Sequence, residues 1–233
     1  MRVGLVTIGD ELLAGETVNT NGAWLAEQLA DRSVRVERIV VVPDRIEDIV
    51  EVVDDYRQRY DAVITTGGIG PTHDDITMRA VADAFDVGVT ESQEAIEWIE
   101  THHGYAREDL TDGTAHIPDG ARMIPNSEGV APGCVLANVY VLPGVPEEMK
   151  AMFGEVSDEF SGETIHVETV LAAEPESALL DRIEAAGDRF EVTIGSYPGE
   201  NVRLKLSGSD AGEVSGAAEW LQSRVDSPAE GSR

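Results

Sequence analysis

Apolar residues along the first 160 positions follow two spacings, one typical of buried strands and the other typical of amphipathic helices. Segments rich in apolar residues predict strands over residues 2–8, 36–42, 60–64 and 135–142, with a short extended piece at 87–90. Apolar residues three and four positions apart predict helices over residues 21–30, 46–60, 76–85, 92–102 and 146–160. Strands that alternate with helices of this length favour a parallel sheet covered on both faces. We therefore expect an α/β domain over residues 1–160, three-layered (α/β/α) with a mainly parallel sheet.

The pattern changes after residue 163, where shorter elements follow each other in a different order. Strands are predicted over residues 164–171, 191–196 and 201–207, and helices over 176–185 and 213–225. This β-α-β-β-α order indicates a small α+β domain over residues 164–226, followed by a polar, frayed tail at 227–233. Within the first domain, residues 104–133 are rich in glycine and proline and predict a long irregular segment.

Acidic residues outnumber basic residues by 45 to 17, which gives the chain a net charge of −28. The acids are spread along the whole length among well-patterned apolar residues, so they do not form a disordered acidic tail. A surface of this charge repels itself in dilute buffer, whereas in molar salt the screening length falls to about 3 Å. We expect a protein adapted to the salt-rich cytoplasm of a halophile.

Three absences narrow the class of protein further. No run approaches the roughly 18–20 apolar residues of a membrane span, and Met1 leads directly into a strand without a signal peptide. The lone cysteine, Cys134, can form no disulfide within the chain and is expected to be a small core residue. These observations predict a cytoplasmic protein without a membrane partner.

The segment from Thr65 to Thr77, which reads TTGGIGPTHDDIT, carries the strongest chemical signal. It joins a predicted strand to a predicted helix, and a glycine-rich turn at a helix start binds anions through outward-pointing backbone N–H groups. Asp74 and Asp75 stand at the same turn, where they would repel a bare phosphate. A divalent cation that bridges the carboxylates to phosphate oxygens would remove this conflict. The alternative is that one of the two aspartates only caps the helix.

Other carboxylates follow neighbouring predicted strands and should meet this loop at the carboxyl edge of the sheet. Asp10 and Glu11 come directly after the first strand and, with Asp74 and Asp75, could form an oxygen-ligand site for Mg²⁺ or a similar ion. They could equally form a solvated acidic loop. Asp44 follows the second strand, and with Glu47 three residues on it has the spacing of a capping box, so capping alone would also explain it.

The remaining polar candidates each have a functional and a structural interpretation. Asn19 and Asn21 could hydrogen-bond the edge of a base or pterin, but one of them, or Thr20, could instead cap the following helix. His73 lies within the glycine-rich segment, where it could be a base or ligand or simply a solvent-facing turn residue. Nucleophilic serine chemistry has no support, because no Gly-x-Ser-x-Gly context surrounds Ser127.

Three separated segments resemble the molybdenum-cofactor biosynthesis domain, in the form found at the N-terminus of CinA (competence/damage-inducible) proteins. They are GDELLAG with NTN at 9–15 and 19–21, TTGGIGPTHDDIT at 65–77, and PNSEGVAPG with LPGVP at 125–133 and 142–146. Ser127 and Val130 depart from the family's pattern and affect only the shape of that one loop. The small second domain is similar to the linker domain that follows in CinA proteins, which is sometimes likened to a KH module. The deamidase domain that completes many of them has no counterpart in this sequence.

The resemblance implies roles for particular residues. The catalytic residues would be Asp75, Asp74 and Asp44, and the metal ligands would be Asp10, Glu11, Asp74 and Asp75. The ligand and its phosphates would contact Thr66, Gly67, Gly68, Gly70, Thr72, Asn19, Asn21, Gly133, Pro143 and Gly144.

The resemblance also implies an activity. Relatives on the CinA branch hydrolyse nucleotide pyrophosphates of the ADP-ribose or FAD type, and the PTHDD form of the loop is similar to that branch. This implies a hydrolase that uses Mg²⁺, Mn²⁺ or Co²⁺, with K⁺ as a further candidate cation. Two alternatives remain open: molybdopterin binding or adenylylation, and a non-catalytic nucleotide- or RNA-binding scaffold.

Expectations about partners follow from the same reasoning. We expect a phosphorylated small molecule, either a nucleotide pyrophosphate or a pterin, and a homo-oligomer. We expect no nucleic-acid partner, because the chain has few basic and aromatic stretches and no Gly-x-x-Gly clamp between helices.

Overall fold

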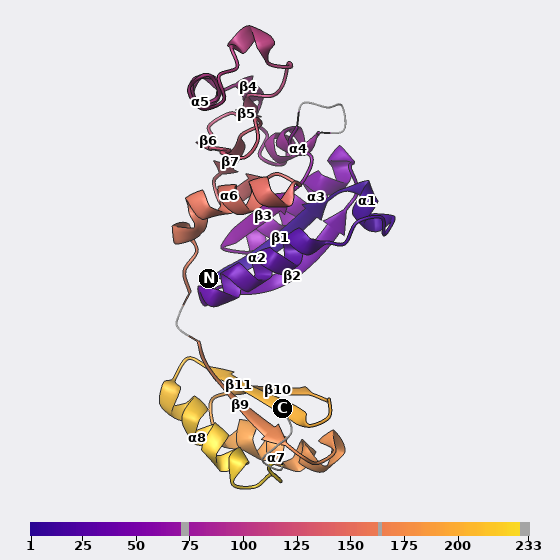
Figure 1. Ribbon diagram of the computed structural model, residues 1–233, viewed down its shortest axis with the longest axis vertical. Coiled ribbons are helices and arrows are strands. Elements are labelled where there is room, and N and C mark those ends of the chain that lie inside the picture. The colour runs from indigo at the N-terminus through magenta and orange to yellow at the C-terminus, as the bar shows by residue number, and fades with distance from the viewer. Residues whose placement is uncertain (71–74, 163–164, 229–233) are drawn as a thin grey trace. The chain divides into compact units, whose positions relative to one another are not determined.

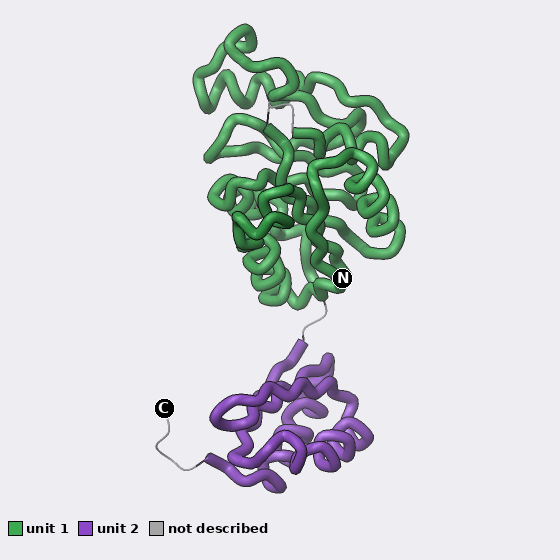
Figure 2. The backbone as a smooth tube through the Cα atoms, turned by 90° about the vertical axis from the view of Figure 1, so that its right-hand side faces the viewer, with its two compact units in different colours: residues 1–162 green, residues 163–233 purple. Residues whose placement is uncertain are grey.

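The computed structural model describes residues 1–70, 75–162 and 165–228 (Figure 1). The chain divides into two compact units, residues 1–162 and residues 163–233, which Figure 2 colours separately. Each unit has its own hydrophobic core and is described by itself. None of the helices in the described part of the chain is both long enough and apolar enough to cross a membrane.

A six-stranded sheet organises the first unit. Its strands are β1 (Arg2–Ile8), β2 (Arg35–Val42), β3 (Ala62–Thr66), β6 (Arg122–Ile124), β7 (Gly133–Leu136) and β8 (Val139–Leu142). They lie in the order β2-β1-β3-β8-β7-β6. The first four strands are parallel, and β7 and β6 add to the sheet in antiparallel fashion. The predicted α/β architecture with a mainly parallel sheet is thereby confirmed.

Helices follow the strands in the alternating order that the apolar spacing predicts. They are α1 (Asp10–Leu13), α2 (Thr20–Asp31), α3 (Ile46–Arg59), α4 (Thr77–Ala84), α5 (Gln93–His103) and α6 (Pro146–Val156), with 3-10 turns at Arg107–Asp109 and Ser157–Glu159. Within the irregular segment, β5 (His116–Pro118) pairs with β4 (Val89–Glu91), which precedes α5, in a small separate ladder.

Two hydrophobic clusters, one on each face of the sheet, account for the three layers (Figure 1). Successive side chains of a strand point to opposite faces. In β1, accordingly, Val3 and Leu5 belong to the cluster that contains residues of α2 and α6, whereas Val6 and Ile8 belong to the cluster with residues of α3, α4 and α5. All four side chains are 3% exposed or less. Burial on both faces explains why apolar residues in this strand do not alternate regularly with polar ones.

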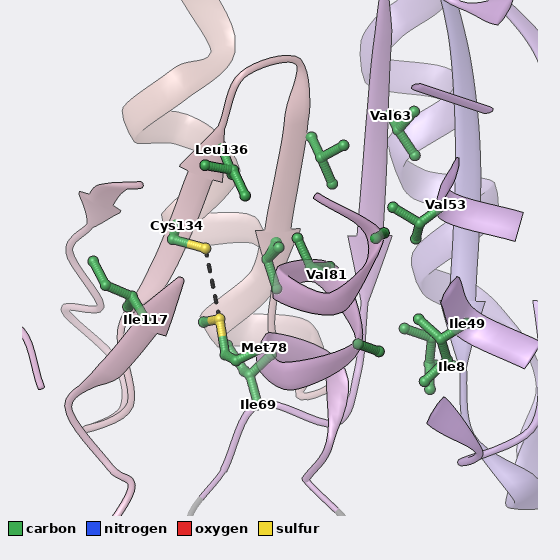
Figure 3. Packing of buried hydrophobic residues seen from close by; sticks show 14 of the residues in the cluster. Ile8, Ile49, Val53, Val63, Ile69, Met78, Val81, Ile117, Cys134 and Leu136 are labelled. Atoms are coloured by element: carbon green, nitrogen blue, oxygen red, sulfur yellow. Dashed lines mark hydrogen bonds between the residues drawn. The ribbon is translucent and has the colours of Figure 1, made fainter. Parts of the chain in front are cut away.

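Cys134 lies inside the core that also contains residues of α3, α4 and α5, as predicted for a lone small residue before a strand. Its side chain is fully buried, and its Sγ lies 3.5 Å from Sδ of Met78 on α4 (Figure 3). Burial raises the pKa of the Cys134 thiol to about 12, because the charged thiolate loses its hydration. The residue therefore serves packing and has no reactive thiolate at neutral pH.

One strand prediction was wrong. The apolar run 135–142 forms two antiparallel strands, β7 and β8, instead of a single strand. Ala137 between them has a positive φ of 52°, and the Asn138 side chain donates to the carbonyls of Arg57 and Tyr60. Ala137 and Asn138 form a tight turn between the two strands. Apolar spacing alone does not reveal this turn, because the residues before and after it are buried.

The predicted capping box at the start of α3 was also wrong. The helix begins at Ile46, and the residue before it, Arg45, makes no capping hydrogen bond through its side chain. The carboxylate of Asp44 instead accepts a hydrogen bond from the backbone N–H of Asp10. Asp44 therefore links the ends of β1 and β2.

The second unit is a three-stranded antiparallel sheet with two helices. Its elements are β9 (His166–Ala172), α7 (Glu176–Arg189), β10 (Thr193–Tyr197), β11 (Val202–Gly208) and α8 (Ala211–Gln222). The strands lie in the order β10-β11-β9. Leu204 and Leu206 of β11 pack with Leu179 of α7 and Leu221 of α8. The predicted small α+β unit is confirmed, and most of the predicted frayed tail lies outside the described residues.

Candidate functional site

The segments that follow β1, β3 and β8 meet at one edge of the main sheet. The backbone N–H of Gly67, just after β3, donates to the carbonyl of Leu142 at the end of β8 (3.1 Å). On the other side, the N–H of Gly9 after β1 donates to the carbonyl of Val42 at the end of β2 (3.1 Å). Because these neighbouring parallel strands end at the same edge of the sheet, the loops that follow them lie close together, as the sequence predicted.

Gly67 and Gly68 make a turn that only glycine adopts readily. Their φ angles are +105° and +63°, in the region that side chains disfavour. A Cβ on Gly67 would lie 2.3 Å from the carbonyl oxygen of Ile8. Thr77, the first residue of α4, closes the turn: its Oγ1 donates to the Gly67 carbonyl (2.7 Å) and its N–H donates to the Gly68 carbonyl (3.0 Å).

The turn leaves backbone donors available for a ligand. Among the hydrogen bonds of the described residues, none is donated by the backbone N–H groups of Gly68, Ile69 or Gly70. Backbone N–H groups that lie at least partly buried require an acceptor, from protein, water or ligand. Three such donors in succession next to a helix start form an anion-binding concavity.

Two carboxylates flank this turn. Oδ2 of Asp44 accepts the Asp10 N–H at 2.9 Å, and its Oδ1 lies 3.7 Å from the position that a Cβ on Gly68 would take. Oδ2 of Asp75 lies 2.6 Å from the corresponding position on Gly70. The residue that precedes α4 is Ile76, and it makes no capping hydrogen bond through its side chain.

A cavity of about 570 Å³ opens beside the turn. Its floor includes Gly68, Gly70 and Asp75, together with Pro143 and Gly144 after β8. Its volume falls within the range of about 300–1,000 Å³ that is typical of small-molecule sites. The cavity is therefore lined by both the predicted phosphate-binding turn and a predicted catalytic carboxylate.

A smaller cavity, of about 90 Å³, shares Gly144 with the large one. It is also lined by Glu11, Asn19, Asn21 and Thr66. The Asn21 side chain donates to the Gly144 carbonyl at 2.8 Å, but its Oδ1 is buried and accepts no hydrogen bond from the described residues. Such an orphaned acceptor indicates a place for a ligand donor or a water molecule.

Asn19 is used by the fold itself. Its Oδ1 accepts from the N–H of Gly22 and so caps α2, and its Nδ2 donates to Thr7 Oγ1 (3.0 Å for each). Of the two interpretations of Asn19, the capping role is therefore present in the structure. The Glu11 side chain folds back over Gly9: a Cβ added to Gly9 would lie 2.4 Å from Oε1 of Glu11.

Gly133 is part of the sheet, where a Cβ would lie 2.3 Å from the carbonyl oxygen of Val141, and it does not line the cavities beside the turn. Thr72, His73 and Asp74 lie outside the described residues. Within the described ranges, no three His, Cys, Asp or Glu side chains come close enough together to hold a metal ion.

The site also includes two residues that the sequence analysis did not identify, Asn126 and Glu148. Asn126 is 1% exposed and holds the loop before β7: its Nδ2 donates to the Ala131 carbonyl (2.9 Å) and to Glu148 Oε2 (2.7 Å). Its Oδ1 accepts from the N–H groups of Glu128 and Gly129. Glu148, on α6, lines the large cavity. An Asn–Ser–Glu–Gly turn sequence was the available signal for this loop.

Replacing Asn126 by alanine is expected to lower the free energy of unfolding by about 2–3 kcal/mol, because buried groups on the loop lose their partners. Urea denaturation of the purified protein measures the effect. Ser127→Ala is the control, since Ser127 is the exposed neighbour. Equal stability of the two variants would contradict the organising role of Asn126.

The irregular segment supplies the rest of the large cavity. Tyr105, Asp109, Leu110, Thr111 and Thr114 all line it. The sequence analysis assigned no role to these five positions, because neither periodicity nor a motif marks them. Only the fold brings them opposite Gly68 and Gly70.

Comparison with known proteins agrees with this architecture. A family model described as "Probable molybdopterin binding domain" matches residues 4–161. A protein of Archaeoglobus fulgidus is 33% identical over 220 residues, which cover 94% of this chain and 95% of that protein. A protein of Aeropyrum pernix is 39% identical over 211 residues, which cover 84% and 79%.

A solved structure extends the comparison to the fold. The protein CinA, of unknown function, from Thermoplasma acidophilum has 34% sequence identity and a TM-score of 0.63, covering 68% of this chain and 97% of its own. These matches confirm the resemblance carried by the three sequence segments, and this chain belongs to the molybdopterin-binding domain family.

Proposed function

We propose that the first unit is a divalent-metal-dependent hydrolase of nucleotide pyrophosphates of the ADP-ribose or FAD type. The observation that carries the proposal is the row of N–H donors at Gly68, Ile69 and Gly70, which have no acceptor among the described residues, beside the Asp75 carboxylate. Both features border a cavity large enough for a nucleotide. A phosphate bound beside a carboxylate is the arrangement that hydrolysis of a phosphoanhydride requires.

The donor chemistry around the turn fits a hard divalent cation. The flanking side chains, Asp44 and Asp75, offer carboxylate oxygens, which Mg²⁺ and Mn²⁺ prefer. Mg²⁺ is commonly held by one or two carboxylates together with substrate phosphates and waters, so a full cage of protein ligands is not needed. When bound, such an ion lowers the pKa of a coordinated water and offsets charge on the phosphates.

Residues of this chain would bind the phosphates, activate the attacking water and contact the base. The N–H groups of Gly68 to Gly70 would donate to phosphate oxygens, holding the phosphoanhydride at the turn. The Asp75 carboxylate, beside Gly70, would orient the attacking water and accept its proton. Tyr105 and Leu110 would contact the base and exclude water from that part of the cavity.

Molybdopterin binding or adenylylation is the second candidate function. Membership of the molybdopterin-binding domain family favours it. A pterin phosphate would use the same turn for its phosphate, and the carboxylates of Asp109 and Glu148 in the cavity could accept hydrogen bonds from the pterin amine. The two functions differ in whether a phosphoanhydride is consumed.

A hydrolysis screen tests the proposal. The purified full chain is incubated in molar KCl with ADP-ribose, FAD, NAD or ATP and with Mg²⁺, Mn²⁺ or Co²⁺, and the released mononucleotides are quantified by chromatography. We expect metal-dependent release of AMP from ADP-ribose or FAD. Tight binding of a pterin without hydrolysis of any of the four nucleotides would instead support the second candidate.

We also propose that the protein is adapted to high salt, on the basis of its net charge of −28. The melting temperature is expected to rise as KCl increases from about 0.1 M to about 3 M, because screening removes repulsion between surface carboxylates. Circular dichroism melts at several KCl concentrations measure this. A melting temperature that does not change over the series would contradict the proposal.

A further inference from the structure

The three-stranded sheet of the second unit has one covered face and one open face. One residue of each strand marks the covered face: Val170, Ile194 and Leu204 pack with side chains of α7 and α8, which lie on the same side of the sheet (Figure 1). Successive residues of a strand point to opposite faces, so their neighbours belong to the other side. We call that side the open sheet face; it consists of Val167, Thr169 and Leu171 on β9, Arg203, Lys205 and Ser207 on β11, and Thr193, Gly195 and Tyr197 on β10.

Large apolar side chains are exposed on the open sheet face. Val167 is 49% exposed, Leu171 44% and Tyr197 47%, and none of them belongs to a hydrophobic cluster of the described residues. The Tyr197 ring lies over Gly195, because a Cβ added to Gly195 would be 3.0 Å from Cε2 of the ring. Exposed apolar residues that gather on one face indicate a binding surface, whereas those scattered singly need no explanation.

The charge of the open sheet face is opposite to that of the chain. None of its nine residues is acidic, although acidic residues outnumber basic ones by 45 to 17 in the whole sequence. Its two cations, Arg203 and Lys205, are exposed, and neither forms an ion pair with any of the described residues. Arg203 instead lies over the Tyr197 ring, with Cζ 4.8 Å from the ring centroid. Cations without carboxylate partners on an apolar face are complementary to an acidic partner.

We propose that the open sheet face binds an acidic amphipathic helix of a partner protein. The apolar stripe of the helix covers Val167, Leu171 and Tyr197, and carboxylates beside the stripe pair with Arg203 and Lys205. A helix with apolar residues three and four positions apart and acids between them presents this combination. In molar salt the screening length is about 3 Å, so only ion pairs in direct contact contribute and the apolar contacts supply most of the affinity.

Two other occupants fit this face less well. A second copy that used the same face would place Arg203 and Lys205 against the same two cations, and like charges across an interface repel. A single-stranded nucleic acid requires aromatic rings on which its bases stack. Tyr197 is the one aromatic residue among the nine, and its ring already contacts Gly195 and Arg203.

Fluorescence anisotropy with the full chain in molar KCl tests the proposal. The probe is a fluorescein-labelled helical peptide with leucine on one face and glutamate on the other. A scrambled peptide of the same composition has no apolar face, and labelled oligothymidylate is the nucleic-acid probe. The amphipathic acidic peptide is expected to bind at least about tenfold more tightly than either of the other two probes.

Two substitutions assign the binding to the open sheet face. Leu171→Ser and Arg203→Glu are each expected to weaken the acidic peptide at least about tenfold, because each removes a central contact. Leu180→Ser is the control for the first, since Leu180 is 58% exposed on α7. Arg189→Glu is the control for the second, because Arg189 is also exposed and also lies over an aromatic ring, that of Phe190. Both controls are expected to change the affinity less than about twofold.

Several outcomes would overturn the proposal. They are no binding of the acidic peptide by the unmodified protein, and an unchanged affinity in either Leu171→Ser or Arg203→Glu with the fold verified by circular dichroism. Tighter binding of oligothymidylate that Arg203→Glu abolishes would assign the face to nucleic acid instead. Self-association in sedimentation experiments that Leu171→Ser abolishes would assign it to a second copy of this chain.

Discussion

Replacing Asp75 by asparagine is expected to slow hydrolysis of ADP-ribose at least about 100-fold, the usual minimum for loss of a general base. The carboxylate lies beside Gly70 and lines the large cavity, where a phosphoanhydride would be held. Asparagine keeps the size of the side chain but cannot accept a proton or bind a cation as a carboxylate does. Initial rates at saturating metal, measured with the purified variant, give the result.

The control for this prediction is Asp158→Asn, which removes an exposed carboxylate from the 3-10 turn after α6. Its rate is expected to stay within about twofold of the unmodified protein, because surface substitutions away from a site have small effects. Thermal melts establish that both variants fold. A correctly folded Asp75→Asn protein with an unchanged rate would show that Asp75 takes no part in the chemistry.

Replacing Gly67 by alanine is expected to lower the free energy of unfolding by about 3 kcal/mol or more. Its φ of +105° is strained for any L side chain, and the added Cβ would lie 2.3 Å from the carbonyl oxygen of Ile8. That oxygen belongs to a central strand and cannot move without disturbing the sheet. For a chain of this length, the melting temperature should fall by roughly 5 °C or more.

Gly154→Ala is the matched control, because Gly154 lies within α6 and no atom comes within 4 Å of the added Cβ. This substitution is expected to raise stability by about 0.5–1 kcal/mol, since alanine favours a helix more than glycine does. If both alanine variants melted alike, the close approach of Gly67 to β1 would have no energetic importance.

The elements that the sequence predicted well have strong periodic signals and clear ends. β1 is a mainly apolar segment that the structure reproduces from Arg2 to Ile8, because both of its faces are covered by helices. α5 was marked by Ser92, which caps it through a hydrogen bond from the Ala95 N–H. The glycine turn after β3 was predictable because its sequence has no other simple explanation.

The rest could not be read from local pattern. The turn between β7 and β8 contains Ala137 in a conformation that favours glycine, so the residue type at this position does not indicate a turn. Asp44 has the spacing of a cap, yet it binds the N–H of Asp10, a contact between residues 34 positions apart. Tyr105 and Asp109 line the large cavity only because the irregular segment folds back over the turn.

The close packing between the glycine loops has a consequence for engineering this protein. A Cβ on Gly144 would come within 3.3 Å of the Gly67 Cα, and Gly67 in turn lies against Ile8, so backbone meets backbone with no side chain between. Mutagenic libraries directed at these loops should yield few folded proteins. Libraries directed at Tyr105, Asp109 and Thr111, which border the large cavity from the irregular segment, should change ligand preference while the chain continues to fold.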